Sequence, residues 1–235
     1  MRALLKRDLR SYFNNMTGVI FIAVFLCFTG IFVMMYNFYY MNSSIVYAVS
    51  SMMPILAVLV PIITAKSFMI ERQSGADRLL YSLPLTSSEV VLGKYAALIS
   101  VFAIPLAFMA VLPPFISLFG EINILSAYLC LLDFFAFGAA LIAVCMFISS
   151  VSNSTVVSLS VSYGALVVLY LLNMLSAALP NGSFFARLLS YVSMFGSIDS
   201  LVYCLFDIRT LLYYISITAV FVFLTVRSFE KKRLA

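Results

Sequence analysis

Residues 17 to 36 read TGVIFIAVFLCFTGIFVMMY, a run of twenty residues without a charged side chain. A helix needs about 20 residues to cross the hydrocarbon core of a bilayer, so a run of this kind is a candidate membrane span. Backbone polar groups find no water inside the bilayer, and a helix satisfies them within one segment. The Val, Ile and Phe residues therefore predict a transmembrane helix here rather than a strand.

Five further apolar blocks of similar character follow along the 235-residue chain. They lie at about residues 45–65, 95–118, 124–148, 156–179 and 211–226. Hydrophobic residues make up 64% of the sequence and charged residues only 10%, which is too few to coat a soluble protein of this size. The sequence predicts an all-α integral membrane protein with six transmembrane helices in a single domain, residues 1–235.

The first 14 residues carry a different pattern. Leu5, Leu9 and Tyr12 share one helical face, and basic residues occupy the rest of the helix. This arrangement is typical of a short helix that lies in the membrane interface with its basic groups near lipid phosphates. A signal peptide has a similar charged start. Here, however, the apolar block that follows is long and no small-residue cleavage motif is evident, so we expect residues 1–14 to be retained.

The distribution of basic residues predicts the orientation. With six spans and the amino terminus inside, twelve of the fourteen Lys and Arg residues fall on the cytoplasmic side, and only Arg187 and Arg209 fall outside. This asymmetry predicts that both termini are cytoplasmic. It also accounts for the net charge of +5 without a nucleic acid partner.

Residues 183–210 do not form a clear span. The segment is moderately apolar but is interrupted by Arg187, Gly196, Asp199, Asp207 and Arg209. We expect short re-entrant helices that dip partway into the membrane from the outside, where protein rather than lipid surrounds the broken backbone. A seventh full span is the less favoured alternative.

The sequence contains no recognisable catalytic or metal-binding pattern. Histidine is absent, which excludes a Ser-His pair, and the four cysteines have no paired spacing. Gly93-Lys94-Tyr95 resembles the end of a phosphate-binding loop, but Tyr95 stands where Ser or Thr is required. We expect neither a bound cofactor nor a metal, and no enzymatic activity in this chain. Small residues at 138–140 are expected to allow close helix packing.

The longest charged segment, residues 66–94, is expected at the cytoplasmic surface. Gly75 can end the helix that leaves the second span, and a short helix carrying Leu79 and Leu80 can follow. An ordinary solvated loop is the alternative, but such a loop has no reason to expose leucines. Thr86-x-x-Glu89 then fits a capping box, which predicts the start of the next helix.

Three segments of the chain resemble segments of a known protein family. Residues 71–94, with their Gly, Leu-Pro and Gly-Lys positions, resemble the loop of ABC-2 type permeases, and FISSVSNSTVV at 147–157 resembles the same family after its fourth span. Residues 195–233 are similar to the gliding-motility-associated (GldF-like) branch. The resemblance covers nearly the whole chain. The family pattern has Glu, Thr and Glu at the positions of Ile70, Ala76 and Arg78. At Arg78 a positive charge therefore stands where the family has a negative one.

The resemblance implies the permease subunit of an ATP-driven ABC exporter in a bacterial cytoplasmic membrane. Such a permease pairs with a second copy or a paralogue and binds ATP-binding cassette subunits, which hold ATP and Mg²⁺. The short inner helix would act as the coupling helix. Its contact residues would be Glu71, Gly75, Asp77, Arg78, Leu79 and Leu80.

Asp133 is the one acidic residue well inside a predicted span. It lies about ten residues from the start of the fourth span, near the bilayer centre at roughly 1.5 Å per residue. A charge there costs at least about 2.5 kcal/mol, so Asp133 should face the bundle interior, a partner subunit or a wet cavity. Its role is either helix packing or a polar point in the transport path.

A stand-alone secondary transporter or channel is the alternative function. Such a protein needs ionisable or unwound intramembrane sites and often has repeated halves. The sequence offers one such acid, Asp133, and no clear repeat.

Overall fold

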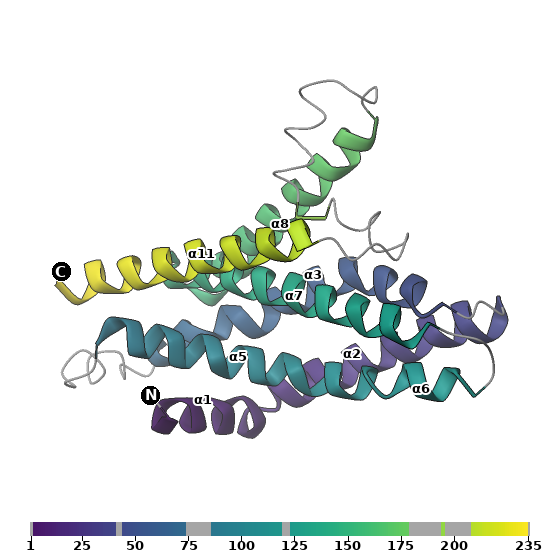
Figure 1. Ribbon diagram of the computed structural model, residues 1–235. Helices are drawn as coiled ribbons and strands as arrows, with labels where there is room; N and C mark the ends of the chain where they lie inside the picture. The colour runs from purple at the N-terminus through teal and green to yellow at the C-terminus, as the bar shows by residue number, and fades with distance from the viewer. Residues whose placement is uncertain are drawn as a thin grey trace.

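The computed structural model describes residues 2–40, 44–73, 86–118, 123–178, 194–195 and 208–234, which form helices and turns. The helices are α1 (Arg2–Asn14), α2 (Thr17–Val33), η1 (Met34–Tyr39), α3 (Val46–Gln73), α5 (Ser87–Met109), α6 (Leu112–Ile116), α7 (Ile124–Val151), α8 (Thr155–Ala178) and α11 (Ile208–Leu234). They form an elongated bundle (Figure 1). Within the described residues, six segments are long and apolar enough to cross a membrane, as predicted.

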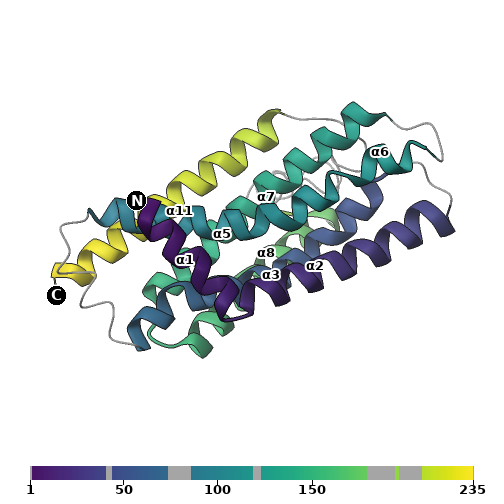
Figure 2. The ribbon, with the colours of Figure 1, turned by 90° about the horizontal axis from the view of Figure 1, so that it is seen from below.

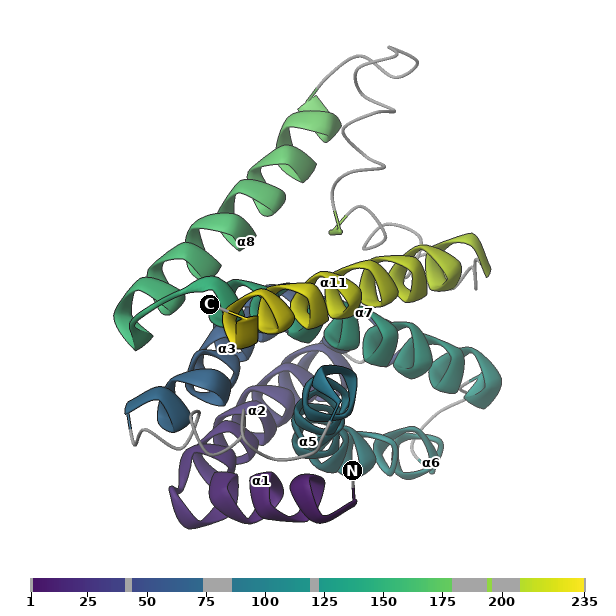
Figure 3. The same cartoon turned by 90° about the vertical axis from the view of Figure 1, so that its left-hand side faces the viewer.

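Two helices, α3 and α7, form the centre of the bundle. In their most apolar stretches, 61% of the α3 residues and 67% of the α7 residues are buried inside the protein, against 17% for α8 and 11% for α11. The α7 helix packs against α3, α5, α8 and α11. Figures 1 and 3 show α8 leaning away from the other helices toward its carboxyl end. The outer helices therefore present most of their apolar surface to the surroundings.

Local sequence signals set several helix boundaries. Asn123 caps α7 by accepting a hydrogen bond from the Ser126 backbone at 3.2 Å, as expected for an N-cap asparagine. Met16 turns the chain between α1 and α2 in the left-handed conformation, with a φ of 55°. Pro113 and Pro114 carry no N–H to continue the α5 hydrogen-bond ladder, so α5 ends and α6 starts as a separate short helix.

Many hydroxyl side chains inside the spans donate to the backbone of their own helix. Their oxygens donate to carbonyls three or four residues earlier, a pattern that removes an unsatisfied polar group from an apolar environment. Such bonds measure 2.7–2.9 Å from Thr29, Ser50, Thr64, Ser100 and Thr225. Serine and threonine within these helices therefore do not by themselves mark a transport route.

The first span is longer than predicted. The sequence places a polar link after Tyr36, whereas the helix continues as the π-helix η1 and buries Asn37. Tyr36 packs against Tyr40 and Tyr47, with ring centroids 6.2 and 6.3 Å apart. These ring contacts stabilise the last turn, so the apolar pattern alone underestimates the length of the helix.

The predicted inner segment 66–94 is mostly helical in the part that the structure describes. The α3 helix continues to Gln73, and α5 begins at Ser87, so the connection between them is restricted to residues 74–86. Gly75, predicted to end α3, lies outside the described residues. The predicted short helix between them lies outside the described residues.

Met194 and Phe195 are the described residues of the segment 183–207, and both are buried. The Phe195 ring packs edge-on against Phe137 of α7, with centroids 5.3 Å apart, and against Tyr170 of α8 at 5.5 Å. The Tyr214 hydroxyl of α11 donates to the Met194 carbonyl at 3.0 Å. This part of the chain therefore reaches the middle of α7, while the predicted re-entrant helices remain a prediction.

Three phenylalanines interlock at the centre of the bundle. Phe25 of α2, Phe102 of α5 and Phe134 of α7 are fully buried, and each pair of rings has centroids 6.2 Å apart. Gly138 provides the space for this arrangement, because a Cβ atom placed there would lie 2.5 Å from Cζ of Phe102. The predicted close packing at residues 138–140 is thus confirmed at Gly138.

Candidate functional site

One end of the bundle collects the basic residues and both chain termini (Figure 2). Eleven of the fourteen Lys and Arg residues lie in α1, near the end of α3, near the start of α5 or near the end of α11. We call this the basic end. Arg209 begins α11 at the opposite end, and Arg78 and Arg187 lie outside the described residues. This distribution agrees with the predicted charge asymmetry.

The start of α5 has the predicted capping box. The Glu89 backbone donates to the Thr86 hydroxyl at 3.4 Å, and the Thr86 backbone donates to the Glu89 carboxylate at 3.2 Å. Two backbone donors that would otherwise have no intrahelical partner are satisfied in this way. The box fixes the position at which the chain re-enters the bundle after residues 74–85.

The predicted coupling residues cannot be assembled into a site from the structure. Glu71 lies in the last turn of α3, where the backbone alone is described. The other five, Gly75, Asp77, Arg78, Leu79 and Leu80, fall outside the described residues. Their contact with an ATPase remains a prediction, but both helices that flank them are described and both are anchored in the bundle.

Lys94 anchors the helix that follows the coupling segment. Its side chain is only 4% exposed, and its ammonium group donates to the Ser67 carbonyl of α3 at 3.0 Å. It also lies 3.8 Å from Asp8 Oδ2 of α1 and 5.2 Å from the centre of the Phe68 ring. A buried ammonium group is tolerated only when it is paired in this manner. Lys94 therefore joins α1, α3 and α5.

Asp8 was missed as a site residue in the sequence. It is buried on α1, and Arg7 donates to its Oδ1 from Nε at 3.0 Å. The available signal was its position one turn before Tyr12, which places it beside the apolar face of the helix. Because Tyr12 and Asp8 are both buried, α1 is docked onto the bundle by this face.

Lys232 fastens the carboxyl end of α7. Its ammonium group donates to the carbonyls of Ser150 at 2.6 Å and Val151 at 3.2 Å. A cation at the end of a helix satisfies orphan carbonyls and interacts favourably with the helix dipole. The Ser149 hydroxyl also donates to the Ala65 carbonyl of α3 at 3.3 Å. The ends of α3, α7 and α11 are therefore linked to one another.

Asp133 lies in α7 and is 2% exposed, so it faces the interior of the bundle, as the sequence predicts. It is one turn away from Phe137 and adjacent to Phe134, in the apolar centre. The burial is compatible with both predicted roles. Its part in a transport path remains a prediction.

Within the described residues, no three His, Cys, Asp or Glu side chains are arranged to hold a metal ion. Cys130 and Cys145 are buried, and Cys27 is exposed on α2. The polar contacts at the basic end thus join helices rather than forming a recognisable reaction centre.

A comparison with protein-family models finds one described as ABC-2 family transporter protein, which matches residues 3–230. The match includes five of the six candidate spans and all but the last two residues of the sixth. No curated protein matches the chain.

Proposed function

Because the chain belongs to the ABC-2 transporter family, we propose that it is the permease subunit of an ATP-driven exporter in a bacterial cytoplasmic membrane. The family match along almost the entire chain is the observation that carries the proposal. A multi-pass permease of this family works with separate ATP-binding subunits. ATP and Mg²⁺ would therefore bind to the partner, and the cargo would cross between membrane helices of paired permeases.

The basic end faces the cytoplasm in this proposal. Both termini lie there together with most basic residues, which is the orientation that the positive-inside rule favours. The docked helix α1 would then lie at the inner membrane interface. A reporter fused to the carboxyl terminus should be active on the cytoplasmic side, and activity outside would reverse the topology.

The coupling element is the segment around Glu71, Gly75, Asp77, Arg78, Leu79 and Leu80. Lys94 supports this role, because it joins α3 and α5, the two helices that the segment connects along the chain. Movement of the segment would reach the bundle through these two helices. Leu79 and Leu80 would enter a groove on the ATPase, since buried apolar anchors dominate such interfaces, and the charged residues would form the rim.

Co-purification with an ATPase and a double substitution test the proposal together. Leu79→Ala with Leu80→Ala should leave the complex folded but uncouple ATP hydrolysis from transport. The matched control is Leu92→Ala with Leu132→Ala, two leucines exposed on α5 and α7, which should transport normally. Normal transport by the first variant would show that the segment is not the coupling element. A purified chain that transports without any ATPase would refute the exporter.

Three finer assignments follow from the sequence. Residues 207–214 and 224–228 support membership of the gliding-motility-associated branch, which the neighbouring genes would test. The contact between Phe195 and Phe137, at the middle of α7, supports an outer segment that dips into the bundle. Asp133 is proposed as a polar point of the transport path, and its test is given below.

A further inference from the structure

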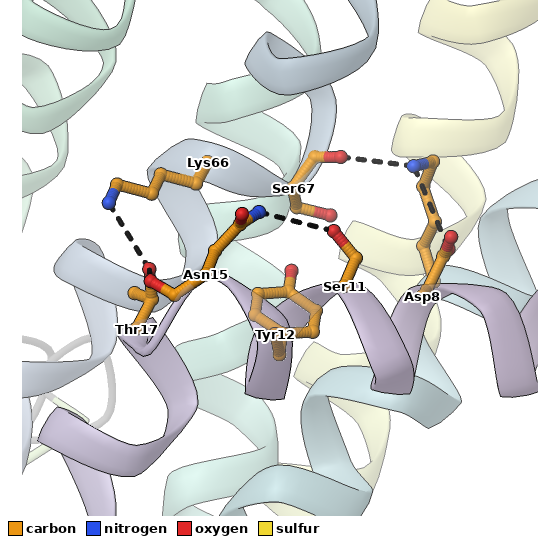
Figure 4. Close-up of a pocket in the computed structure, with 8 residues that line it drawn as sticks. Asp8, Ser11, Tyr12, Asn15, Thr17, Lys66 and Ser67 are labelled. Atoms are coloured by element: carbon orange, nitrogen blue, oxygen red, sulfur yellow. Dashed lines mark hydrogen bonds and ion pairs between the residues drawn. The ribbon is translucent and has the colours of Figure 1, made fainter.

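A small polar pocket lies between α1, the start of α2, α3 and α5 (Figure 4). Its volume is about 40 Å³, and its eight lining residues are Asp8, Ser11, Tyr12, Asn15, Thr17, Lys66, Ser67 and Lys94. A space of this size holds a few water molecules or a small oxyanion. It is too small for a nucleotide or a sugar, which distinguishes it from a cargo route.

The charges around the pocket favour an anion. The lining carries two ammonium groups, Lys66 and Lys94, and one carboxylate, Asp8. Arg7 already forms an ion pair with that carboxylate at 2.9 Å. Lys66 donates to a neutral group, the Thr17 hydroxyl, at 3.2 Å. A cation beside low-dielectric surroundings is stabilised by an opposite charge. The Lys66 ammonium group can therefore donate a charge-assisted hydrogen bond to an anion in the pocket.

The polar groups of the pocket include donors and one carboxylate oxygen, Asp8 Oδ2, that forms an ion pair with Lys94. Figure 4 shows Ser11 and Tyr12 of α1, and Asn15 directly after it, between Lys66 and Thr17 on one side and Asp8 on the other. Among the described residues, no donor is within hydrogen-bond distance of Asp8 Oδ2, although this atom is buried and Lys94 lies 3.8 Å away. Buried polar atoms normally have a partner, so this oxygen can accept a hydrogen bond from a group that enters the pocket.

The pocket lies beside the ends of two candidate spans. Thr17 is the first residue of the first candidate span, and Lys66 is three residues from the end of the second. The residues beside it on α1 are rich in basic groups. Positively charged pockets between membrane helices on the cytoplasmic side can bind the phosphates of anionic lipids.

We propose that this pocket binds the phosphate group of an anionic phospholipid of the inner leaflet. Lys66 and Lys94 hold the phosphate oxygens, with hydroxyls of α1 and Thr17 around them. A bound water or head-group hydroxyl donates to Asp8 Oδ2. The lipid thus completes the contact between α1 and the bundle. The inference requires a membrane-embedded chain with the basic end inside, but it does not require coupling to an ATPase.

Thermal unfolding of the purified full chain tests the site. The protein has no Trp, but Cys130 and Cys145 are buried, so a thiol-reactive dye reports unfolding. Phosphatidylglycerol added in detergent should raise the Tm in a saturable manner, and phosphatidylcholine should have a much smaller effect. Native mass spectrometry should show one retained anionic lipid per chain.

Variants at Lys66 separate the pocket from general surface charge. Lys66→Gln should weaken the apparent affinity for phosphatidylglycerol by about tenfold or more, the effect expected for one charge-assisted bond. Lys66→Arg should retain most of the affinity, and Lys6→Gln, an exposed residue of α1, should behave like the parent. Equal affinities in Lys66→Gln and Lys6→Gln would overturn the proposal. If Lys66→Gln does not fold, Ser11→Ala provides a milder loss of one pocket hydroxyl.

Inorganic phosphate identifies the source of the anion. If phosphate alone gives the full Tm shift and the lipid adds nothing, the pocket binds a soluble anion and the lipid assignment is wrong. If phosphatidylcholine stabilises the chain as strongly as phosphatidylglycerol, the preference for a net negative charge is wrong. Loss of ATPase coupling in the Leu79 and Leu80 variant would leave all these lipid results unchanged.

Discussion

The centre of the bundle and its basic end hold the same helices together by different means. At the centre, Phe25, Phe102 and Phe134 interlock, and Gly138 admits the Phe102 ring. At the basic end, Lys94 joins three helices through one carbonyl and one carboxylate. Apolar helix surfaces gain little from contact with each other rather than with lipid, so the centre depends on shape.

The difference indicates where the bundle can rearrange. Interlocked rings cannot slide without loss of packing, because a packed core has few intermediate arrangements. A charge contact can instead re-pair with water, a lipid or another protein at modest cost. The basic end, beside the proposed coupling segment, is therefore the region where a signal can enter without disturbing the centre.

The strongest test of the centre is Gly138→Ala. The added methyl group collides with the Phe102 ring, and overpacking of this kind typically costs about 1–3 kcal/mol, so we expect a loss near the upper end of that range. Gly164→Ala is the matched control, since a Cβ there meets nothing within 4 Å. It should be neutral or stabilise the helix by up to about 1 kcal/mol. Dye-monitored unfolding measures both, and equal Tm values would refute packing by shape.

A smaller effect is expected from Lys94→Met at the basic end. Methionine fills a similar volume but removes the contacts with Ser67 and Asp8, while Arg7 continues to neutralise Asp8. We expect a loss of about 2 kcal/mol, below the 3–5 kcal/mol that follows when a buried charge is left without a partner. Lys6→Met is the exposed control.

Hydrogen exchange should locate the effect of Lys94→Met. Faster exchange in α1, with unchanged protection in α7, would support independent behaviour of the two regions. Uniform loss of protection in both helices would contradict the comparison.

The smallest effect on stability is expected from Asp133→Asn. Asparagine keeps the shape of this buried side chain, so the free energy of unfolding should fall by about 1 kcal/mol or less, a typical value for a single substitution. If Asp133 lies in the transport path, the variant should assemble fully yet lose transport and cargo-stimulated ATPase activity. Full activity of the variant would show that Asp133 serves in helix packing and not in the transport path.

The membrane spans could be predicted because the bilayer sets the length of each apolar block. The capping box at Thr86 and Glu89 could be predicted because its two members lie three residues apart. Burial of Asp133 followed from the cost of a charge in lipid. In each case the physical constraint acts within one helix or between the helix and its solvent.

Contacts between distant segments could not be predicted in the same way. Asp8 and Lys94 belong to separate elements, and the charge pattern of α1 alone gave no reason to pair them. The π-helical end of the first span depends on Tyr47 in the next helix. The space at Gly138 was expected, but its occupant, Phe102, follows from the arrangement of α5 against α7.

The contact of Lys232 with α7 has a consequence for synthesis of the chain. The carbonyls of Ser150 and Val151 emerge from the ribosome long before their partner, which follows Ser150 by 82 positions. Until α11 has been translated, water or lipid head groups must satisfy these carbonyls. The docking of α11 then replaces that solvation with a lysine, so a residue translated 82 positions later closes the end of the central helix.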